Sequence, residues 1–119
     1  MATKHGIEID PSVSIGKGFC IGHAFCVTIN PNARLGDNIT VQKGVTIGQE
    51  NRGSRKGAPV LGNNIWVGVN ASVIGHIAIG DNVLIAPNAF VNRDIPNDSV
   101  VFGNPCIVKH NEQATKDYI

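Results

Sequence analysis

The chain has 119 residues, of which 42% are hydrophobic and 16% are charged, and its formal net charge at pH 7 is +1. This length fits one domain, residues 1–119, and the balance of apolar and charged residues excludes a disordered chain. The near-neutral charge speaks against broad binding of nucleic acids or anionic membranes, and no apolar run approaches the length of a membrane span.

The three cysteines, Cys20, Cys26 and Cys106, form neither a metal-binding spacing nor an even set for disulfides. The N-terminal stretch has no apolar segment of the kind that a signal peptide carries. We therefore expect a reduced, cytoplasmic protein in which the cysteines are small buried hydrophobes.

An aliphatic residue returns every six positions through most of the chain. The positions are Ile9, Ile15, Ile21, then Ile29, Leu35, Val41, Ile47, then Leu61, Val67, Val73, Ile79, Ile85, Val91. A period of six fits neither an amphipathic helix nor an alternating strand. It predicts an all-β solenoid, a parallel β-helix in which each hexad supplies one short strand and one turn and three hexads close a triangular coil.

Turn-forming residues follow the aliphatic positions at fixed distances, as a solenoid with tight corners requires. Asparagines sit three positions after five of them, at Asn38, Asn64, Asn70, Asn82 and Asn88. Residues 18 apart should then stack in neighbouring coils, which places Ile9 against Val27 and Leu61 against Ile79. The alternative, a β-sandwich of short strands, gives no reason for one period to persist.

The period breaks in two places and then ends. Two extra residues enter around Val27-Thr28, and about eight enter in a polar, basic segment at residues 49–58, which should be an outward loop. After Val91 the sequence contains two prolines and leaves the repeat. We expect coils over about residues 6–96 and a tail over about 97–119 that forms a short helix or frays.

The stretches HGIEIDPSVSIGKGFCIGHA, QKGVTIG, APVLGNNIWVGVNASVIG and FGNPCIV resemble the hexapeptide-repeat acyltransferases, and their order is most similar to serine acetyltransferases and polysaccharide O-acetyltransferases. The resemblance runs from about Gly6 to Lys109. It implies a left-handed coil, a homotrimer and acetyl-CoA as co-substrate, with no metal. Serine acetyltransferases carry an N-terminal helical domain before this region, so the chain resembles a minimal acetyltransferase or a catalytic fragment.

His23 is the candidate general base, because acyl transfer to a hydroxyl needs a base that titrates near neutrality. The resemblance gives the histidine of this GHA motif the role of removing the proton of the acceptor hydroxyl. Glu8 is the candidate carboxylate that orients the imidazole, where the family pattern has aspartate. Asp10 competes for that role, although it could instead be a turn residue before Pro11.

By the same resemblance, the pantetheine arm of acetyl-CoA should lie along Gly68, Val69, Ala86 and Pro87. The phosphates need cations, and the available set is Arg52, Arg55, Lys56 and Lys109. His76 lies at a hexad corner and would reach acceptor or CoA only if a neighbouring subunit brought it there.

The acceptor is expected to be a small sugar or polysaccharide precursor. Serine acetyltransferases carry aspartate where this chain has Gly22, and Arg-His where it has Gly57-Ala58, so the charges that bind serine are missing. Serine O-acetyltransferase is the alternative, and a non-catalytic trimeric scaffold is a further one. A γ-type carbonic anhydrase would need three zinc-binding histidines, and only His23 and His76 lie within the coils.

Overall fold

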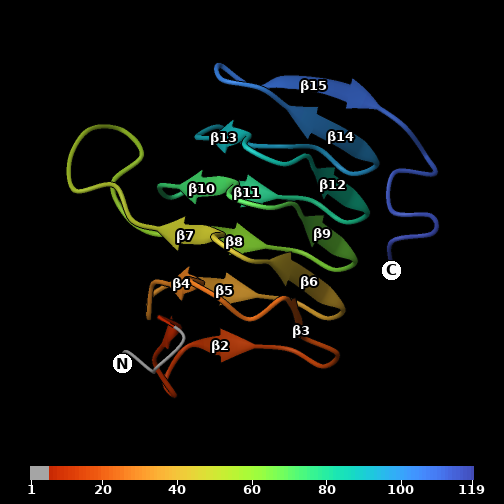
Figure 1. Ribbon diagram of the computed structural model, residues 1–119. Coiled ribbons are helices and arrows are strands. Elements are labelled where there is room, and N and C mark those ends of the chain that lie inside the picture. The colour runs from red at the N-terminus through yellow and green to blue at the C-terminus, as the bar shows by residue number, and fades with distance from the viewer. Residues whose placement is uncertain (1–5) are drawn as a thin grey trace.

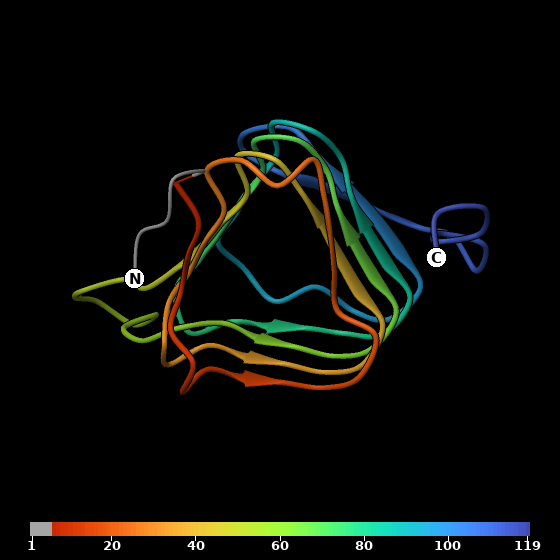
Figure 2. The ribbon, with the colours of Figure 1, turned by 60° about the horizontal axis from the view of Figure 1, so that its bottom comes forward.

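The chain folds as the predicted parallel β-helix. The computed structural model describes residues 6–119, which contain short β-strands and no helix. Successive strands pass from one sheet to the next around a triangular coil (Figures 1 and 2). Each strand pairs in parallel with the strand above it, with the single exception of the last.

Three sheets form the faces of the prism, here named A, B and C. Sheet A contains β1 (Glu8–Ile9), β4 (Thr28–Ile29), β7 (Thr46–Gly48), β10 (Ser72–Ile74) and β13 (Phe90–Val91). Sheet B contains β2 (Ser14–Ile15), β5 (Arg34–Leu35), β8 (Val60–Leu61) and β11 (Ala78–Ile79). Sheet C contains β3 (Cys20–Gly22), β6 (Ile39–Gln42), β9 (Ile65–Val67), β12 (Val83–Ile85), β14 (Ser99–Phe102) and β15 (Ile107–His110).

The predicted aliphatic positions fill the interior. From the second coil upward they are almost fully buried, as Ile29, Val41, Ile47, Val67 and Val73 illustrate with exposures of 0–2%. The small or apolar residue four positions later completes each layer; Ala33, Val45, Ala71 and Ala89 are all buried. Packing one column of Ile and Val side chains on the next is the main apolar burial of this fold.

The first break in the period lies at a different place from the one predicted. Ile9 pairs with Ile29 rather than with Val27, and Ile21 pairs with Val41, so both steps are 20 residues. Val27 is a fully buried core residue. The two extra residues belong instead to the corner that precedes it, where His23 and Cys26 both have φ near 54°. A tight corner that bulges outward absorbs an insertion at lower cost than a buried strand.

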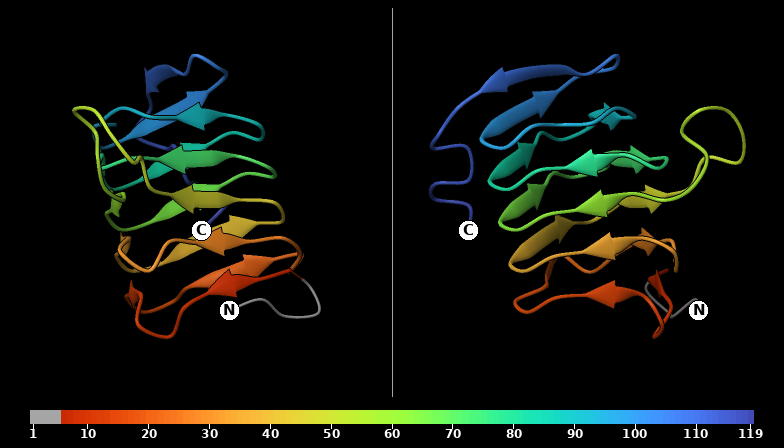
Figure 3. Two further views of the ribbon diagram at one scale, coloured as in Figure 1. Left: turned by 90° about the vertical axis from the view of Figure 1, so that its left-hand side faces the viewer. Right: turned by 180° about the vertical axis from the view of Figure 1, so that it is seen from behind.

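The second break matches the prediction. Ile47 pairs with Val73, a step of 26 residues, and the following step, from Leu61 to Ile79, returns to the predicted 18. The eight extra residues form a loop that projects from the coil between β7 and β8 (Figure 3). An antiparallel bridge between Glu50 and Gly57 closes its neck.

The corners contain the predicted asparagines in the left-handed backbone conformation. Asn38, Asn64, Asn70, Asn82 and Asn88 have φ of 58–63°. At the corner between sheets B and C, side-chain oxygens also link the coils: Asn63 Oδ1 accepts from the N–H of Asp37, and Asp81 Oδ1 accepts from the N–H of Asn63. Asparagine tolerates this backbone region and satisfies corner amides at the same time.

The coil continues past the point where the sequence predicted its end. Ile95 bridges Ile79, and β14 extends sheet C with Val101 fully buried. The steps shorten to 16 residues, because the corner after Val91 is two residues shorter, which hides the period. β15 then pairs antiparallel with β14.

The tail forms neither the expected helix nor a frayed end. Residues 111–119 make successive turns that run back along sheet C (Figure 1). Ala114 and Thr115 are buried, and the ring of Tyr118 lies 4.9 Å from that of Trp66. Among residues 6–119, no helix is long and apolar enough to cross a membrane.

Candidate active site

The edge of the prism where sheet C turns into sheet A, here called the C–A edge, holds His23. The edge continues through corners at Lys43, Val69 and Pro87. Backbone hydrogen bonds stack these corners: Gly44 N–H donates to Phe25 O, Asn70 N–H to Lys43 O, and Asn88 N–H to Val69 O. The base candidate and the pantetheine candidates therefore share one straight edge of the molecule.

His23 stands where the inserted residues push the chain outward. It follows β3, has φ 54° and is exposed. The carbonyl of His23 accepts a hydrogen bond from Phe25 N–H at 2.7 Å, which folds the corner tightly. Phe25 is 55% exposed, so an apolar ring lies open beside the imidazole. The corner can thus present a base and an apolar surface to a molecule that docks on this edge.

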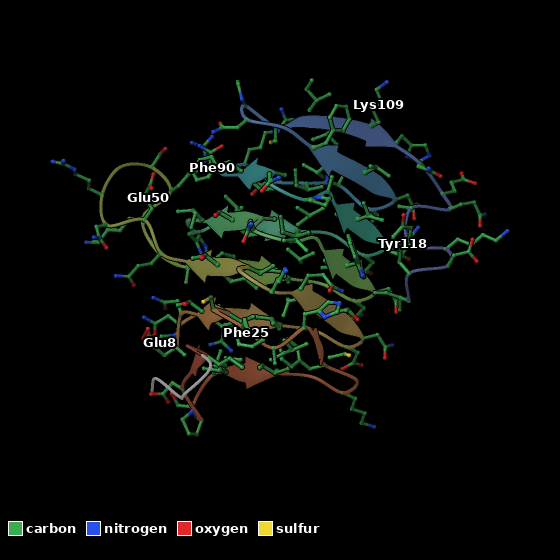
Figure 4. The ribbon with its side chains drawn as sticks, in the orientation of Figure 1. Glu8, Phe25, Glu50, Phe90, Lys109 and Tyr118 are labelled. Carbon is green, nitrogen blue, oxygen red and sulfur yellow. The ribbon has the colours of Figure 1, made fainter. Side chains whose placement is uncertain are left out.

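Glu8 and His23 approach each other around the first corner but do not pair directly. Glu8 is exposed on β1 and pairs with Thr28, five positions after His23. Its label in Figure 4 lies at the end of the β-helix nearest the N-terminus. Within residues 6–119 no hydrogen bond or ion pair joins its carboxylate to the imidazole.

Asp10 is engaged in a turn. Its Oδ1 accepts hydrogen bonds from Ser12 Oγ at 2.7 Å and from Ser12 N–H at 2.8 Å. These bonds, the side-chain one first, hold the pKa of Asp10 below its usual value. Of the two carboxylates that the sequence offered, Glu8 is therefore the one without this turn role.

A shallow groove of about 340 Å³ lies on sheet A beside Glu8. Its polar lining comes from Glu8, Asp10, Thr28 and Asn30, and its apolar lining includes Ile29, Pro31 and Ile47. No lysine, arginine or histidine lines it among the residues that the structure describes. Hydroxyl and carboxylate groups over an apolar floor suit a small polar ligand better than an anion.

Gly68 and Ala86 occupy equivalent places in successive coils of the C–A edge. The amide of Gly68 donates to Ile85 O and that of Ala86 donates to Val101 O, each at 2.8 Å, so both amides already serve the coil. A Cβ on Gly68 would lie 2.6 Å from Pro87 N, which leaves only glycine at this contact. What this part of the edge offers a ligand is a narrow surface of small residues.

The cation candidates do not gather on the C–A edge within one chain. Arg52, Arg55 and Lys56 lie in the loop between β7 and β8, on the edge where sheet A turns into sheet B, and all three are exposed. Lys109 lies on β15 at the opposite end of the β-helix from Glu8 (Figure 4). The sequence interpretation passed over Lys43, an exposed cation that lies on the C–A edge itself; only the stacking of corners reveals it.

No group of three or more His, Cys, Asp or Glu side chains converges as a metal site among residues 6–119. The cysteines are free, with Cys20 and Cys26 exposed and Cys106 buried. The expectation that all three are buried is wrong for the first two, because β3 and the inserted corner turn these side chains outward.

The comparisons with known proteins agree with this geometry. Residues 58–93 match the family model described as bacterial transferase hexapeptide (six repeats). The chain is 42% identical over 100 residues to serine acetyltransferase of Synechococcus elongatus, covering 84% of this chain and 41% of the relative. It is 41% identical over 99 residues to serine acetyltransferase of Helicobacter pylori, covering 83% and 58%.

Solved structures are similar over most of the chain. Serine acetyltransferase of Neisseria gonorrhoeae superposes with a TM-score of 0.82 and 31% identity, covering 96% of this chain and 45% of that one. Soybean serine acetyltransferase in complex with serine gives 0.81 and 28%, covering 87% and 43%. The chain spans about half the length of the relatives it matches.

Proposed function

The chain belongs to the hexapeptide-repeat transferase family, and on this premise we propose that it is the catalytic β-helix of an acetyl-CoA-dependent O-acetyltransferase. The observation that carries the proposal is the C–A edge. An exposed histidine in an outward corner lies at one end of a stack of small residues that leaves room for a thin ligand arm. Acetyl-CoA is the co-substrate that such an edge would hold.

His23 is proposed as the general base. Its imidazole takes the proton of the acceptor hydroxyl while the oxygen attacks the thioester carbonyl, forming a tetrahedral intermediate. The intermediate collapses, the C–S bond breaks, and the imidazolium returns the proton to the departing CoA thiolate. Glu8 would approach the imidazolium during this step, orienting the ring and stabilising its charge.

Gly68, Val69, Ala86 and Pro87 are proposed to contact the pantetheine arm, with Lys43 as an additional cation on the same edge. Arg52, Arg55, Lys56 and Lys109 are proposed for the phosphates of CoA. The three loop cations lie on another edge in the same chain, so a neighbouring subunit would have to supply them. We therefore propose a homotrimer, which analytical ultracentrifugation would test by its mass.

L-Serine is the first candidate acceptor. The relatives at about 40% identity are named serine acetyltransferases, which favours serine over the sugar that the sequence interpretation preferred. A sugar hydroxyl is the second candidate, because Gly22 and Ala58 bring no charge and no cation lines the groove beside Glu8. An amino acid bound without a cation would leave its carboxylate unpaired.

The test is release of free thiol from acetyl-CoA against a panel of acceptors: serine, homoserine, free sugars and nucleotide-linked sugars. Transfer that depends on an acceptor, and that His23→Asn abolishes, supports the proposal. Hydrolysis without transfer to any acceptor, or no binding of acetyl-CoA by calorimetry, favours the scaffold alternative. The acceptor with the highest kcat/KM decides between serine and sugar.

A further inference from the structure

The loop at residues 49–58, here called the basic loop, rests on the next coil rather than standing free. Glu50 and Gly57 exchange two backbone hydrogen bonds of 3.0 Å, which close the neck of the loop. The neck then lies against Gly75 and His76, the corner that follows β10. The loop therefore has a defined floor, and the floor belongs to a different coil.

Gly75 allows the close approach. A Cβ at this position would lie 3.2 Å from the carbonyl oxygen of Arg55 and 3.3 Å from its Cβ. The backbone N–H of the next residue, His76, donates to that same carbonyl oxygen at 2.8 Å. Backbone groups alone thus tie Arg55 to the corner.

The side chain of His76 adds a second tie. Its ring Nδ1 lies 3.2 Å from the carbonyl oxygen of Ala58, a group that can only accept, so Nδ1 carries the proton. Its Cβ lies 3.0 Å from where a Cβ of Gly57 would be, so the two residues are in close contact. Ala58 and Pro59 are buried while Arg52, Arg55 and Lys56 are exposed, so this hydrogen bond lies where the loop re-enters the core.

We propose that His76 is a positioning residue that holds the basic loop through the hydrogen bond from Nδ1 to Ala58 O. It acts through the loop and touches no reacting atom. Because Nδ1 keeps its proton in the neutral tautomer and in imidazolium alike, the hydrogen bond survives titration of the ring. That the loop then presents its cations to acetyl-CoA rests on the proposed function.

Limited digestion with trypsin tests the proposal without any assay of activity. The loop has three cleavage sites, at Arg52, Arg55 and Lys56, and cleavage there requires the loop to leave its floor. Losing one hydrogen bond of ordinary net strength should raise the population of the open loop, and so the cleavage rate, by about 2- to 12-fold. We expect His76→Ala to show this increase while its melting temperature stays near that of the wild type.

His76→Asn is the matched control, because the Nδ2 of asparagine is the same number of bonds from the backbone as Nδ1 of histidine and can donate to the same oxygen. It should restore cleavage to the wild-type rate. Equal cleavage of wild type and His76→Ala, or equally fast cleavage of both variants, would overturn the proposal.

The kinetic arm separates this inference from the proposed function. If the loop serves acetyl-CoA, His76→Ala should raise the KM for acetyl-CoA with kcat little changed, and His76→Asn should restore it. Faster cleavage with an unchanged KM would keep His76 as the residue that holds the loop and would remove the loop from the acetyl-CoA site. Faster cleavage in a protein that transfers no acetyl group would leave the positioning role standing without the enzyme.

Discussion

Asn82 Oδ1 accepts hydrogen bonds from both the N–H and the hydroxyl of Thr115, at 3.2 and 2.5 Å, across 33 positions of sequence. The Nδ2 of the same asparagine donates to Asp98 Oδ1 at 2.8 Å and to Glu112 O at 3.0 Å. One corner residue with φ 58° therefore links the coil to the next corner and to the C-terminal tail. This linkage explains why residues 111–119 are ordered along sheet C without forming a helix.

Asn82→Gly should lower the free energy of unfolding by about 1–3 kcal/mol, because glycine keeps the left-handed backbone and removes the four side-chain hydrogen bonds. Urea unfolding measures the loss. Asn64→Gly, at the same corner one coil earlier and with φ 59°, is the control and should cost less. Equal losses at the two sites would mean that the tail contributes nothing through Asn82.

Gly68→Ala should destabilise the coil by about 1–3 kcal/mol, since its Cβ would meet Pro87 N at 2.6 Å and that backbone cannot yield. Gly48→Ala is the comparison, because the nearest atom there is Ile74 Cδ1 at 3.2 Å, the end of a flexible side chain. Thermal unfolding of both variants should rank Gly68→Ala well below Gly48→Ala. The reverse order would contradict the close stacking of the C–A edge.

His23→Asn should lower the rate of acetyl transfer by about 10²- to 10⁴-fold, because a positioned base contributes that much. Asparagine tolerates φ 54° and cannot act as a base, so the corner should remain folded. His110→Asn is the control on an exposed histidine, and Glu8→Gln should cost less than His23→Asn. Retention of most of the rate by His23→Asn, with every acceptor tested, would remove the proposed base.

Replacing Arg52, Arg55 and Lys56 together by alanine should raise the KM for acetyl-CoA and leave kcat nearly unchanged, because exposed cations bind phosphates without entering the chemistry. The effect should shrink as salt is added. Replacing Lys17, Arg34 and Arg93, three exposed cations elsewhere, changes the net charge equally and is the control. A similar rise in KM for both triple variants would point to net charge rather than to the loop.

Asp10 should make the stability of the first coil depend on pH in the acid range. Its pKa is lowered below 3.8 in the folded state, so the folded protein binds fewer protons and gains stability above the unfolded value. That gain should be lost as pH falls below about 4 through the folded pKa. Urea midpoints at pH 6 and pH 2.5 should therefore converge between wild type and Asp10→Asn. Ser12→Ala should weaken the dependence, because the Ser12 hydroxyl is its leading cause.

The sequence by itself determined the architecture. A six-residue period with β-branched residues inside and asparagine at the corners has one packing solution, because each hexad buries its aliphatic residue only against the hexads above and below it. The same period located the basic loop, since eight residues that fit no coil position must leave the coil. The motif around His23 likewise pointed to the base from the resemblance alone.

Tertiary structure alone decided the positions that depend on non-local contacts. A period counted along the chain cannot say which side of a corner an insertion occupies, so Val27 was misplaced, and it loses the coil at Ile95, where a shortened corner changes the step. It also cannot show that Asn82 fastens the tail or that His76 fastens the loop. Those contacts join residues 18 to 33 positions apart, and only the stacking of coils brings them within hydrogen-bonding distance.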